Sequence, residues 1–233
     1  MFTRTIQCLG QEAFERLQQA RVIIFGLGGV GGWCAEALVR TGIRHLALVD
    51  FDTIAPSNLN RQLVATAANI GLPKAEEMRL RLLSINPSAD ITARCERFDE
   101  TTAAEFRLSK FDYVIDAIDS VPSKVLLARL ATEAGVPLFA SMGAARRLDP
   151  QQVRAAKFQK VQGCPLARSM RQYMKRNLMF PVRDFICVYS AEQPLPAGQS
   201  GQPLGSLAPV VGTFGMTLAS LLVRHILHDG REL

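Results

Sequence analysis

The sequence predicts an α/β fold: a doubly wound, Rossmann-like and mostly parallel sheet with a C-terminal elaboration. Three observations predict it. Short apolar runs rich in β-branched residues alternate with stretches of helical periodicity along the first 143 residues. The first run leads through a glycine-rich turn into a helix and then a second run, which is the pattern of a right-handed βαβ unit. With 233 residues, 48% of them hydrophobic, the chain can also bury one large core.

The elements of this part follow in order. Residues 11–19 place apolar side chains at helical spacing and predict a lead-in helix. Residues 22–25 predict a buried strand, residues 29–41 a helix closed by Gly42, and residues 45–49 a second strand. The alternation continues with helices at 74–84, 103–108 and 123–134, and strands at 91–95, 113–115 and 138–140.

After Gly143 the pattern changes to a basic segment, a strand at 185–189, a Gly- and Pro-rich loop at 193–209 and an apolar helix. No linker interrupts the chain, so we expect residues 144–233 to extend the domain formed by residues 1–143. The apolar run at 208–222 is shorter than a typical membrane span and contains small residues. It predicts a buried core or dimer-interface helix, with membrane association as the weaker alternative and no stable insertion expected.

The five cysteines are scattered and include no C-x-x-C pair. This pattern indicates neither a disulfide framework nor a structural zinc site. The first ten residues contain no apolar leader. A reducing cytoplasm is therefore the expected location.

Residues 26–31 fit the pattern G-x-G-x-x-G between a strand and a helix. Glycines there allow the backbone to approach a phosphate, and the helix N-terminus supplies free amides. Asp50 follows 19 residues after Gly31, where a carboxylate can accept hydrogen bonds from a ribose. Taken alone, the pattern predicts a nucleotide site with NAD as the first expectation, and a tight turn without a ligand as the alternative.

The residues after Asp50 change that expectation. Ser57-Asn58-Leu59-x-Arg61-Gln62 and then Gly71-x-x-Lys74 closely resemble the ThiF, MoeB and HesA superfamily of ubiquitin-activating-type (E1-like) adenylating enzymes. The resemblance implies ATP and Mg²⁺ as cofactors, an ATP-binding adenylation core at residues 1–143 and a basic substrate-binding extension at 144–233. It assigns nucleotide binding to Gly26, Gly28, Gly29, Gly31, Asp50, Asn58, Arg61, Gln62, Lys74 and Asp119, and catalysis to Arg61, Lys74, Asp119 and Arg4.

Two of these assignments have their own arguments. Asp119 belongs to Asp116-Ala117-Ile118-Asp119-Ser120, which is similar to the family's Asp-x-x-Asp-Asn segment and implies a Mg²⁺ ligand at Asp119; Asp116 is interpreted as a strand-end cap. Phe2-x-Arg4 looks like the family's N-terminal Arg-Phe-x-Arg, in which the arginine reaches an ATP site across a homodimer. In isolation, Arg61 or Lys74 would fit a solvated helical face better than a phosphate site; their occurrence together in the motif reverses that interpretation.

The rest of the chain carries a narrower resemblance. Ser141-Met142-Gly143-Ala144, Pro165-Leu166-Ala167, Cys187-Val188-Tyr189-Ser190 and Gly212-Thr213-Phe214-Gly215 resemble the tRNA threonylcarbamoyladenosine dehydratase branch. That branch implies tRNA carrying threonylcarbamoyladenosine as the substrate, with a sulfur-relay or cysteine-desulfurase-type protein as a further partner. Two alternatives stay open: adenylation of the C-terminal glycine of a ubiquitin-like or sulfur-carrier protein, and a non-catalytic nucleotide- or RNA-binding module.

The formal charge of +6 is unevenly distributed. Residues 146–183 hold seven arginines and three lysines against one aspartate, a net +9. Arg168, Arg171, Lys175 and Arg176 recur at helical spacing around Tyr173, which predicts an RNA-binding stripe with an aromatic that could stack on a base. A solvated basic helix is the alternative.

Cys164 stands where the resembling branch has Asp before Pro-Leu-Ala. We expect either a buried, incidental cysteine or a transfer thiol activated by basic neighbours. Cys187, in an apolar run, is expected to belong to the core.

Overall fold

The computed structural model describes residues 1–196 and 204–228. Its centre is a seven-stranded sheet with the order β3-β2-β1-β4-β5-β7-β6. All neighbouring strands are parallel except β6, which runs antiparallel to β7 at one edge. This confirms the predicted fold class. The strands are β1 (Arg21–Phe25), β2 (His45–Val49), β3 (Asp90–Arg94), β4 (Tyr113–Asp116), β5 (Leu138–Ser141), β6 (Val153–Lys157) and β7 (Ile186–Ser190).

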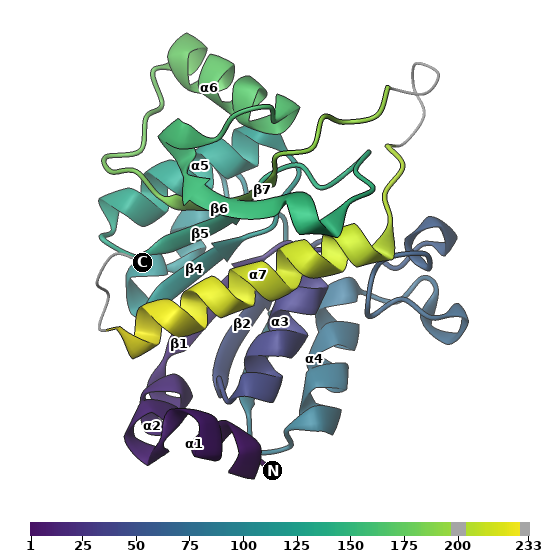
Figure 1. The fold of residues 1–233 in the computed structure, drawn as a ribbon, viewed down its shortest axis with the longest axis vertical. Coiled ribbons are helices and arrows are strands. Elements are labelled where there is room, and N and C mark those ends of the chain that lie inside the picture. The colour runs from purple at the N-terminus through teal and green to yellow at the C-terminus, as the bar shows by residue number, and fades with distance from the viewer. Residues whose placement is uncertain (197–203, 229–233) are drawn as a thin grey trace.

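Helices cover both faces of this sheet (Figure 1). They are α1 (Thr3–Leu9), α2 (Gln11–Gln19), α3 (Gly31–Thr41), α4 (Lys74–Ile85), α5 (Val121–Glu133), α6 (Pro165–Asn177) and α7 (Ala208–Leu227). Alternate residues of β1 face opposite sides, as the period of a strand requires. Val22 and Ile24 join the core under α3, α4 and α7, whereas Ile23 and Phe25 join the core under α5 and α6.

Three local elements differ from the expectation. The helix predicted at 103–108 is wrong: two short 3-10 turns, Ala103–Phe106 and Leu108–Lys110, stand there. Arg107 between them has φ 45°, a left-handed conformation that no α-helix continues through. The structure adds α1, within a stretch that has no clear apolar period. It also adds β6, whose exposed Arg154 suits a strand at the sheet edge.

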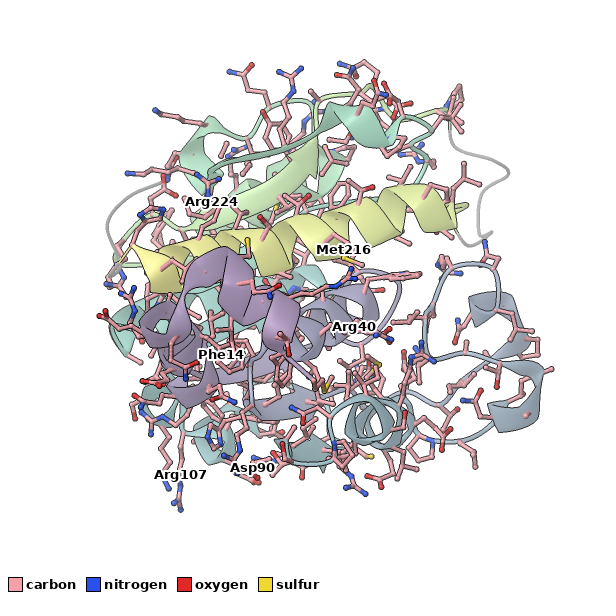
Figure 2. The ribbon with its side chains drawn as sticks, turned by 60° about the horizontal axis from the view of Figure 1, so that its bottom comes forward. Phe14, Arg40, Asp90, Arg107, Met216 and Arg224 are labelled. Atoms are coloured by element: carbon pink, nitrogen blue, oxygen red, sulfur yellow. The ribbon has the colours of Figure 1, made fainter. Side chains whose placement is uncertain are left out.

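The apolar run near the C-terminus forms α7, which is long and apolar enough to cross a membrane, with a mean hydropathy of 1.6. Half of it is buried inside the protein. It lies across α3 and beside α2 (Figures 1 and 2). A Cβ at Gly215 would lie 2.5 Å from the Val30 carbonyl oxygen, so the glycine is what allows α7 to approach α3. The buried half of α7 is what the predicted core or dimer-interface helix requires.

Candidate functional site

The glycine loop joins β1 to α3 at the point where the strand order reverses between β1 and β4. Ligands of doubly wound sheets bind at this place. Gly26 has φ +86°, and a Cβ there would lie 2.6 Å from the Ala117 carbonyl oxygen. A Cβ at Gly31 would lie 1.8 Å from the Gly26 carbonyl oxygen. These two glycines are therefore required by the shape of the loop itself.

The middle of the loop is less crowded. A Cβ at Gly28 would meet only the Gln62 Nε2, at 3.7 Å. A Cβ at Gly29 would lie 3.1 Å from a methyl group of Val211 on α7 and 3.5 Å from Cγ of Arg61. The open side at Gly28 and the free amides of the first turn of α3 form a place where a phosphate can approach the backbone.

Asp50, directly after β2, holds the glycine loop in place through its carboxylate. Its Oδ2 accepts the Leu27 N–H at 2.6 Å, and its Oδ1 accepts the Asp52 N–H at 2.9 Å. Burial raises the pKa of this carboxyl, while these two amides and the charge of Lys74 act in the opposite direction. Each carboxylate oxygen has a second lone pair, so Asp50 can still accept a hydrogen bond from a ribose hydroxyl.

Lys74 begins α4 and is only 5% exposed. Its Nζ lies 2.8 Å from Oδ2 of Asp52, whose side chain is half exposed. The two segments are held together by the Lys74 N–H, which donates to the Asp52 carbonyl. A buried ammonium group paired with a solvated carboxylate can exchange that partner for a phosphate oxygen.

Three residues of the Ser-Asn-Leu-x-Arg-Gln motif surround the loop. Asn58 is buried, and its Oδ1 accepts the Ala55 N–H at 3.0 Å, so part of its function is to hold the backbone. Arg61 donates to the Ser57 carbonyl at 2.7 Å and to Asn60 Oδ1 at 3.0 Å. Gln62 is buried against Gly28, and its Oε1 has no hydrogen-bond partner among residues 1–196 and 204–228. The free amide oxygen is available to a ligand.

Asp116 ends β4 and is fully buried. Its Oδ1 accepts the Ile118 N–H at 3.0 Å, which confirms the strand-end cap. Its Oδ2 lies 2.9 Å from Nζ of Lys124 on α5, which is also fully buried. Burial raises the pKa of Asp116, and the lysine opposes that change. The sequence analysis did not identify Lys124; the only sequence signal was a lysine eight residues after a strand-end aspartate.

Asp119 is exposed just beyond this pair. The preceding Ala117 contacts Gly26 of the loop, so the segment that carries Asp119 lies beside the phosphate-binding backbone. In the described part of the chain, no three His, Cys, Asp or Glu side chains come together as a metal site. One carboxylate is nevertheless enough for Mg²⁺ when phosphate oxygens supply further ligands.

Arg4 is exposed on α1 and is not brought to this site within one chain. The N-terminal helices pack against the far end of α3: the Phe2 and Phe14 rings lie 5.2 Å apart, and Phe14 contacts the position of Gly42. Eleven residues of α3 separate that end from the glycine loop, about 16 Å of helix.

The basic stripe forms α6, but its members have different surroundings. Arg168, Lys175 and Arg176 are exposed. Arg171 instead donates to the Phe158 and Val161 carbonyls at 2.6 and 2.7 Å, and so holds the preceding turn. Tyr173 packs partly buried against the core and is not a free stacking platform.

The two C-terminal cysteines are buried, as expected for the non-catalytic interpretation. Cys187 lies inside β7, where burial holds the pKa of its thiol well above the usual range. Cys164 occupies the N-cap position of α6 without a side-chain capping hydrogen bond, and it borders a pocket.

Comparison with known proteins agrees with this geometry. The model of the ThiF family matches residues 2–233. The tRNA threonylcarbamoyladenosine dehydratase of Bacillus subtilis is 36% identical over 176 residues, which cover 76% of this chain and 69% of that protein. The match to the Escherichia coli dehydratase, at 37% identity, likewise covers 76% of this chain and 66% of that protein. The molybdopterin-synthase adenylyltransferase of Haemophilus influenzae is 31% identical over 94% of this chain and 79% of its own length.

Solved structures extend the similarity over nearly the whole chain. The E. coli tRNA N6-threonylcarbamoyladenosine dehydratase in complex with ATP has a TM-score of 0.90 at 32% identity, covering 98% of this chain and 94% of that chain. The complex of the same enzyme with AMP has a TM-score of 0.91. Together with the match over residues 2–233 and the glycine loop at the switch point, this similarity shows that the chain belongs to the ThiF family.

Proposed function

We propose that the protein is an ATP-dependent tRNA threonylcarbamoyladenosine dehydratase. One observation carries the proposal: the glycine loop, Arg61 and Lys74 converge at one sheet edge in a chain that aligns over 98% of its length with the ATP-bound dehydratase. A site with two cations beside a phosphate loop suits a triphosphate, because charge develops on the phosphates during transfer. Hydride transfer with NAD needs no such cations.

The first step activates a carboxylate. A carboxylate oxygen of the modified adenosine attacks the α-phosphorus of ATP, the bond to the bridging oxygen breaks, and pyrophosphate leaves. The amides of the glycine loop hold the phosphates, and Lys74 and Arg61 stabilise the charge that builds on the departing oxygens. Asp50 positions the ribose through its remaining lone pairs.

The second step closes a ring. A neighbouring nucleophilic group of the same side chain attacks the acyl carbon of the mixed anhydride, its proton is lost to solvent, and AMP departs. One water is lost overall, with its oxygen retained on AMP. The two reacting groups belong to one side chain, so correct positioning supplies much of the rate.

We include Mg²⁺ in the proposal with Asp119 as the protein ligand. The exposed carboxylate beside the loop fits a hard cation that also takes triphosphate oxygens. When bound, the ion would neutralise charge on the leaving pyrophosphate. The cytoplasm as location and a sulfur-relay or cysteine-desulfurase-type partner are parts of the same proposal.

The decisive experiment compares three substrates in ATP–pyrophosphate exchange: tRNA carrying threonylcarbamoyladenosine, unmodified tRNA, and a carrier protein ending in diglycine. We expect exchange, and loss of one water from the nucleoside by mass spectrometry, with the modified tRNA alone. Exchange with the carrier protein alone would instead establish the second candidate, which the similarity to the molybdopterin-synthase adenylyltransferase favours. ATP binding without exchange in all three cases would indicate a binding module.

Replacing Lys74 tests the site within this assay. We expect Lys74→Ala to lower the exchange rate by about 100- to 1000-fold, the usual effect of losing one charge-stabilising group. Asp52 loses its partner but is half exposed, so the fold should remain intact. Arg79→Ala, on the same helix, removes a cation paired with Glu76 and should change the rate little. Equal losses in both variants would contradict the assignment of Lys74.

A homodimer completes the proposal, because Arg4 lies too far from the loop of its own chain. The outer face of α7 and Trp33 form an apolar groove of about 610 Å³ that includes Met216, which is 46% exposed and labelled in Figure 2. We expect Met216→Glu to convert dimers to monomers in light scattering, whereas Leu80→Glu on α4, also exposed, should leave the dimer intact. A dimer that survives Met216→Glu would place the interface elsewhere.

A further inference from the structure

The chain that leaves α6 carries three exposed apolar side chains within five residues. Leu178 is 81% exposed, Phe180 is 51% exposed and Val182 is 67% exposed. We call residues 178–182 the apolar turn. Met179, between the exposed residues, packs against the core under α5 and α6. Single exposed apolar residues need no explanation, but a contiguous group of them is the usual mark of an interaction surface.

Hydrogen bonds hold the apolar turn in one conformation. Leu178 and Met179 both donate their N–H to the Met174 carbonyl of α6, and Val182 donates its N–H to Oγ1 of Thr132 on α5 at 3.1 Å. Leu178 has φ 52°, a left-handed conformation that favours Gly or Asn. Burial of its side chain does not offset this strain. The turn is therefore preorganised with apolar side chains in solvent, which lowers the entropy that binding would lose.

The ring of Phe180 is free to stack on another group. No aromatic ring and no cation contacts it in the described part of the chain. Phe51 is exposed to a similar extent, but the guanidinium of Arg97 lies 3.8 Å from its ring centroid. Tyr173, the aromatic that the sequence placed in the basic stripe, is partly buried. Phe180 is thus the aromatic near this stripe that offers a platform for an unpaired base.

Cations without acidic partners border the apolar turn. Lys175 and Arg176 lie in the last turn of α6, Arg183 follows the apolar turn, and all three are exposed. None of them forms an ion pair within residues 1–196 and 204–228. The neighbouring acid, Asp184, instead accepts the Phe185 N–H at 2.9 Å. Free cations beside an exposed ring suit a partner that combines phosphate charge with flat apolar faces.

The apolar turn lies away from the nucleotide site. The helix α5 begins just after Asp119, and Thr132, which holds Val182, is its twelfth residue. At 1.5 Å per residue the turn is about 17 Å along α5 from the Asp119 end. The helix α6 packs on α5 (Figure 1) and carries the exposed Arg168 near its own start. A ligand that reaches both the glycine loop and the apolar turn must therefore be long.

We propose that the apolar turn is a base-stacking platform for RNA, in which Phe180 stacks on an unpaired base while the three bordering cations contact phosphates. The proposal rests on the proposed tRNA substrate and adds a contact outside the reaction site. A tRNA has unpaired loops, a phosphate backbone and the necessary length. A lipid surface fits the turn less well, because even a whole myristoyl chain gives only marginal membrane binding, and three side chains bury less apolar surface.

The first test measures binding of two unmodified RNAs by fluorescence anisotropy: a hairpin with an unpaired loop and a fully paired duplex. Phe180→Ala should weaken hairpin binding about 5- to 150-fold, the usual effect of losing one aromatic–base stack, and should leave duplex binding unchanged. Arg176→Ala should weaken both, because phosphate contacts do not distinguish bases. Leu80→Ala, on α4 and 49% exposed, is the matched control that should change neither. Equal hairpin affinities of wild type and Phe180→Ala would overturn the proposal.

A second pair of variants separates stacking from plain apolar contact. The chain has one tryptophan, Trp33, in the groove beside α7. Phe180→Trp should keep hairpin binding, and its added fluorescence should be quenched when the hairpin binds; the wild type, titrated in parallel, gives the contribution of Trp33. Phe180→Leu keeps an apolar side chain without a ring and should bind the hairpin as weakly as Phe180→Ala. An unquenched Phe180→Trp, or wild-type affinity in Phe180→Leu, would contradict stacking.

Two further measurements assign a failure to its cause. In ATP–pyrophosphate exchange with modified tRNA, Phe180→Ala should raise the KM for tRNA and leave kcat unchanged, since the turn lies outside the reaction site. Lost hairpin binding in Phe180→Ala, with no exchange even in the wild type, would overturn the dehydratase and leave the platform standing. Vesicles of phosphatidylserine and phosphatidylcholine that bind the wild type but not Phe180→Ala, with hairpin binding intact in both, would replace the platform by a lipid-binding turn.

Discussion

Gly31→Ala should destroy the nucleotide site and destabilise the whole protein. The added Cβ would stand 1.8 Å from the Gly26 carbonyl oxygen and 3.2 Å from Cβ of Ala117. The first contact is to backbone, which cannot turn away as a flexible side chain can. The turn between Gly26 and Gly31 must therefore open. We expect a loss of about 3 kcal/mol or more in the free energy of unfolding and no measurable ATP binding by calorimetry.

Gly28→Ala is the matched comparison. Its Cβ would meet only the Gln62 amide at 3.7 Å, an ordinary contact, and Gly28 has no left-handed φ. The variant should keep the wild-type unfolding temperature within about 2 °C and still bind ATP at least tenfold more weakly, because the methyl group fills the space where phosphate approaches. Wild-type stability in Gly31→Ala would refute the structural role of Gly31. Wild-type ATP affinity in Gly28→Ala would refute the phosphate-binding role of Gly28.

Lys124→Met should be the second most damaging change. It leaves the Asp116 carboxylate fully buried without the cation 2.9 Å away. Removing one partner of a buried ion pair costs about 3–5 kcal/mol, since the remaining charge is uncompensated. Arg21→Met removes the same kind of partner from an exposed pair, in which Nη2 and Asp112 lie 2.9 Å apart. In that control the urea unfolding midpoint should stay close to the wild-type value, because solvent screens an exposed pair.

The pH dependence of Lys124→Met has a defined sign. Burial already raises the pKa of Asp116, and losing the lysine raises it further. A carboxyl whose pKa is higher in the folded state destabilises the fold as pH rises through the interval above its unfolded pKa of about 4. The stability gap between Lys124→Met and the wild type should therefore narrow from pH 8 to pH 5. A constant or widening gap would show that Asp116 is not the residue left unpaired.

The alternating part of the fold could be predicted because each strand is short, apolar and bounded by a turn residue. The strand at residues 45–49 is identical in prediction and structure. The strand β6 could not be predicted in this way, since an edge strand needs only one partner and tolerates charges on both faces. The helix prediction around Arg107 was wrong for another reason. A left-handed backbone at a non-glycine residue does not change the spacing of apolar residues.

The nucleotide-site residues that could be predicted are those that lie close together in the sequence as one motif. Asn58, Arg61 and Gln62 share one segment, and the structure brings that segment to the glycine loop. The same reasoning misjudged the basic region, because a count of charges does not show which way each side chain points. Arg171 turns back to two carbonyls, and Arg147 is buried, although both looked like solvent-facing cations. The sequence analysis missed Lys124 for the same reason, because nothing in the sequence shows that this lysine points into the core.

The contact between α7 and the phosphate loop has a consequence for biosynthesis. Val211 and Gly215 lie against Gly29 and Val30, although some 180 residues of chain separate them. The loop is thus supported by a helix that is synthesised long after the loop itself. During translation the βαβ unit can form early, but its phosphate-binding turn lacks one wall until residues 208–227 have left the ribosome. A nascent chain should therefore gain affinity for ATP only after residues 208–227 have emerged.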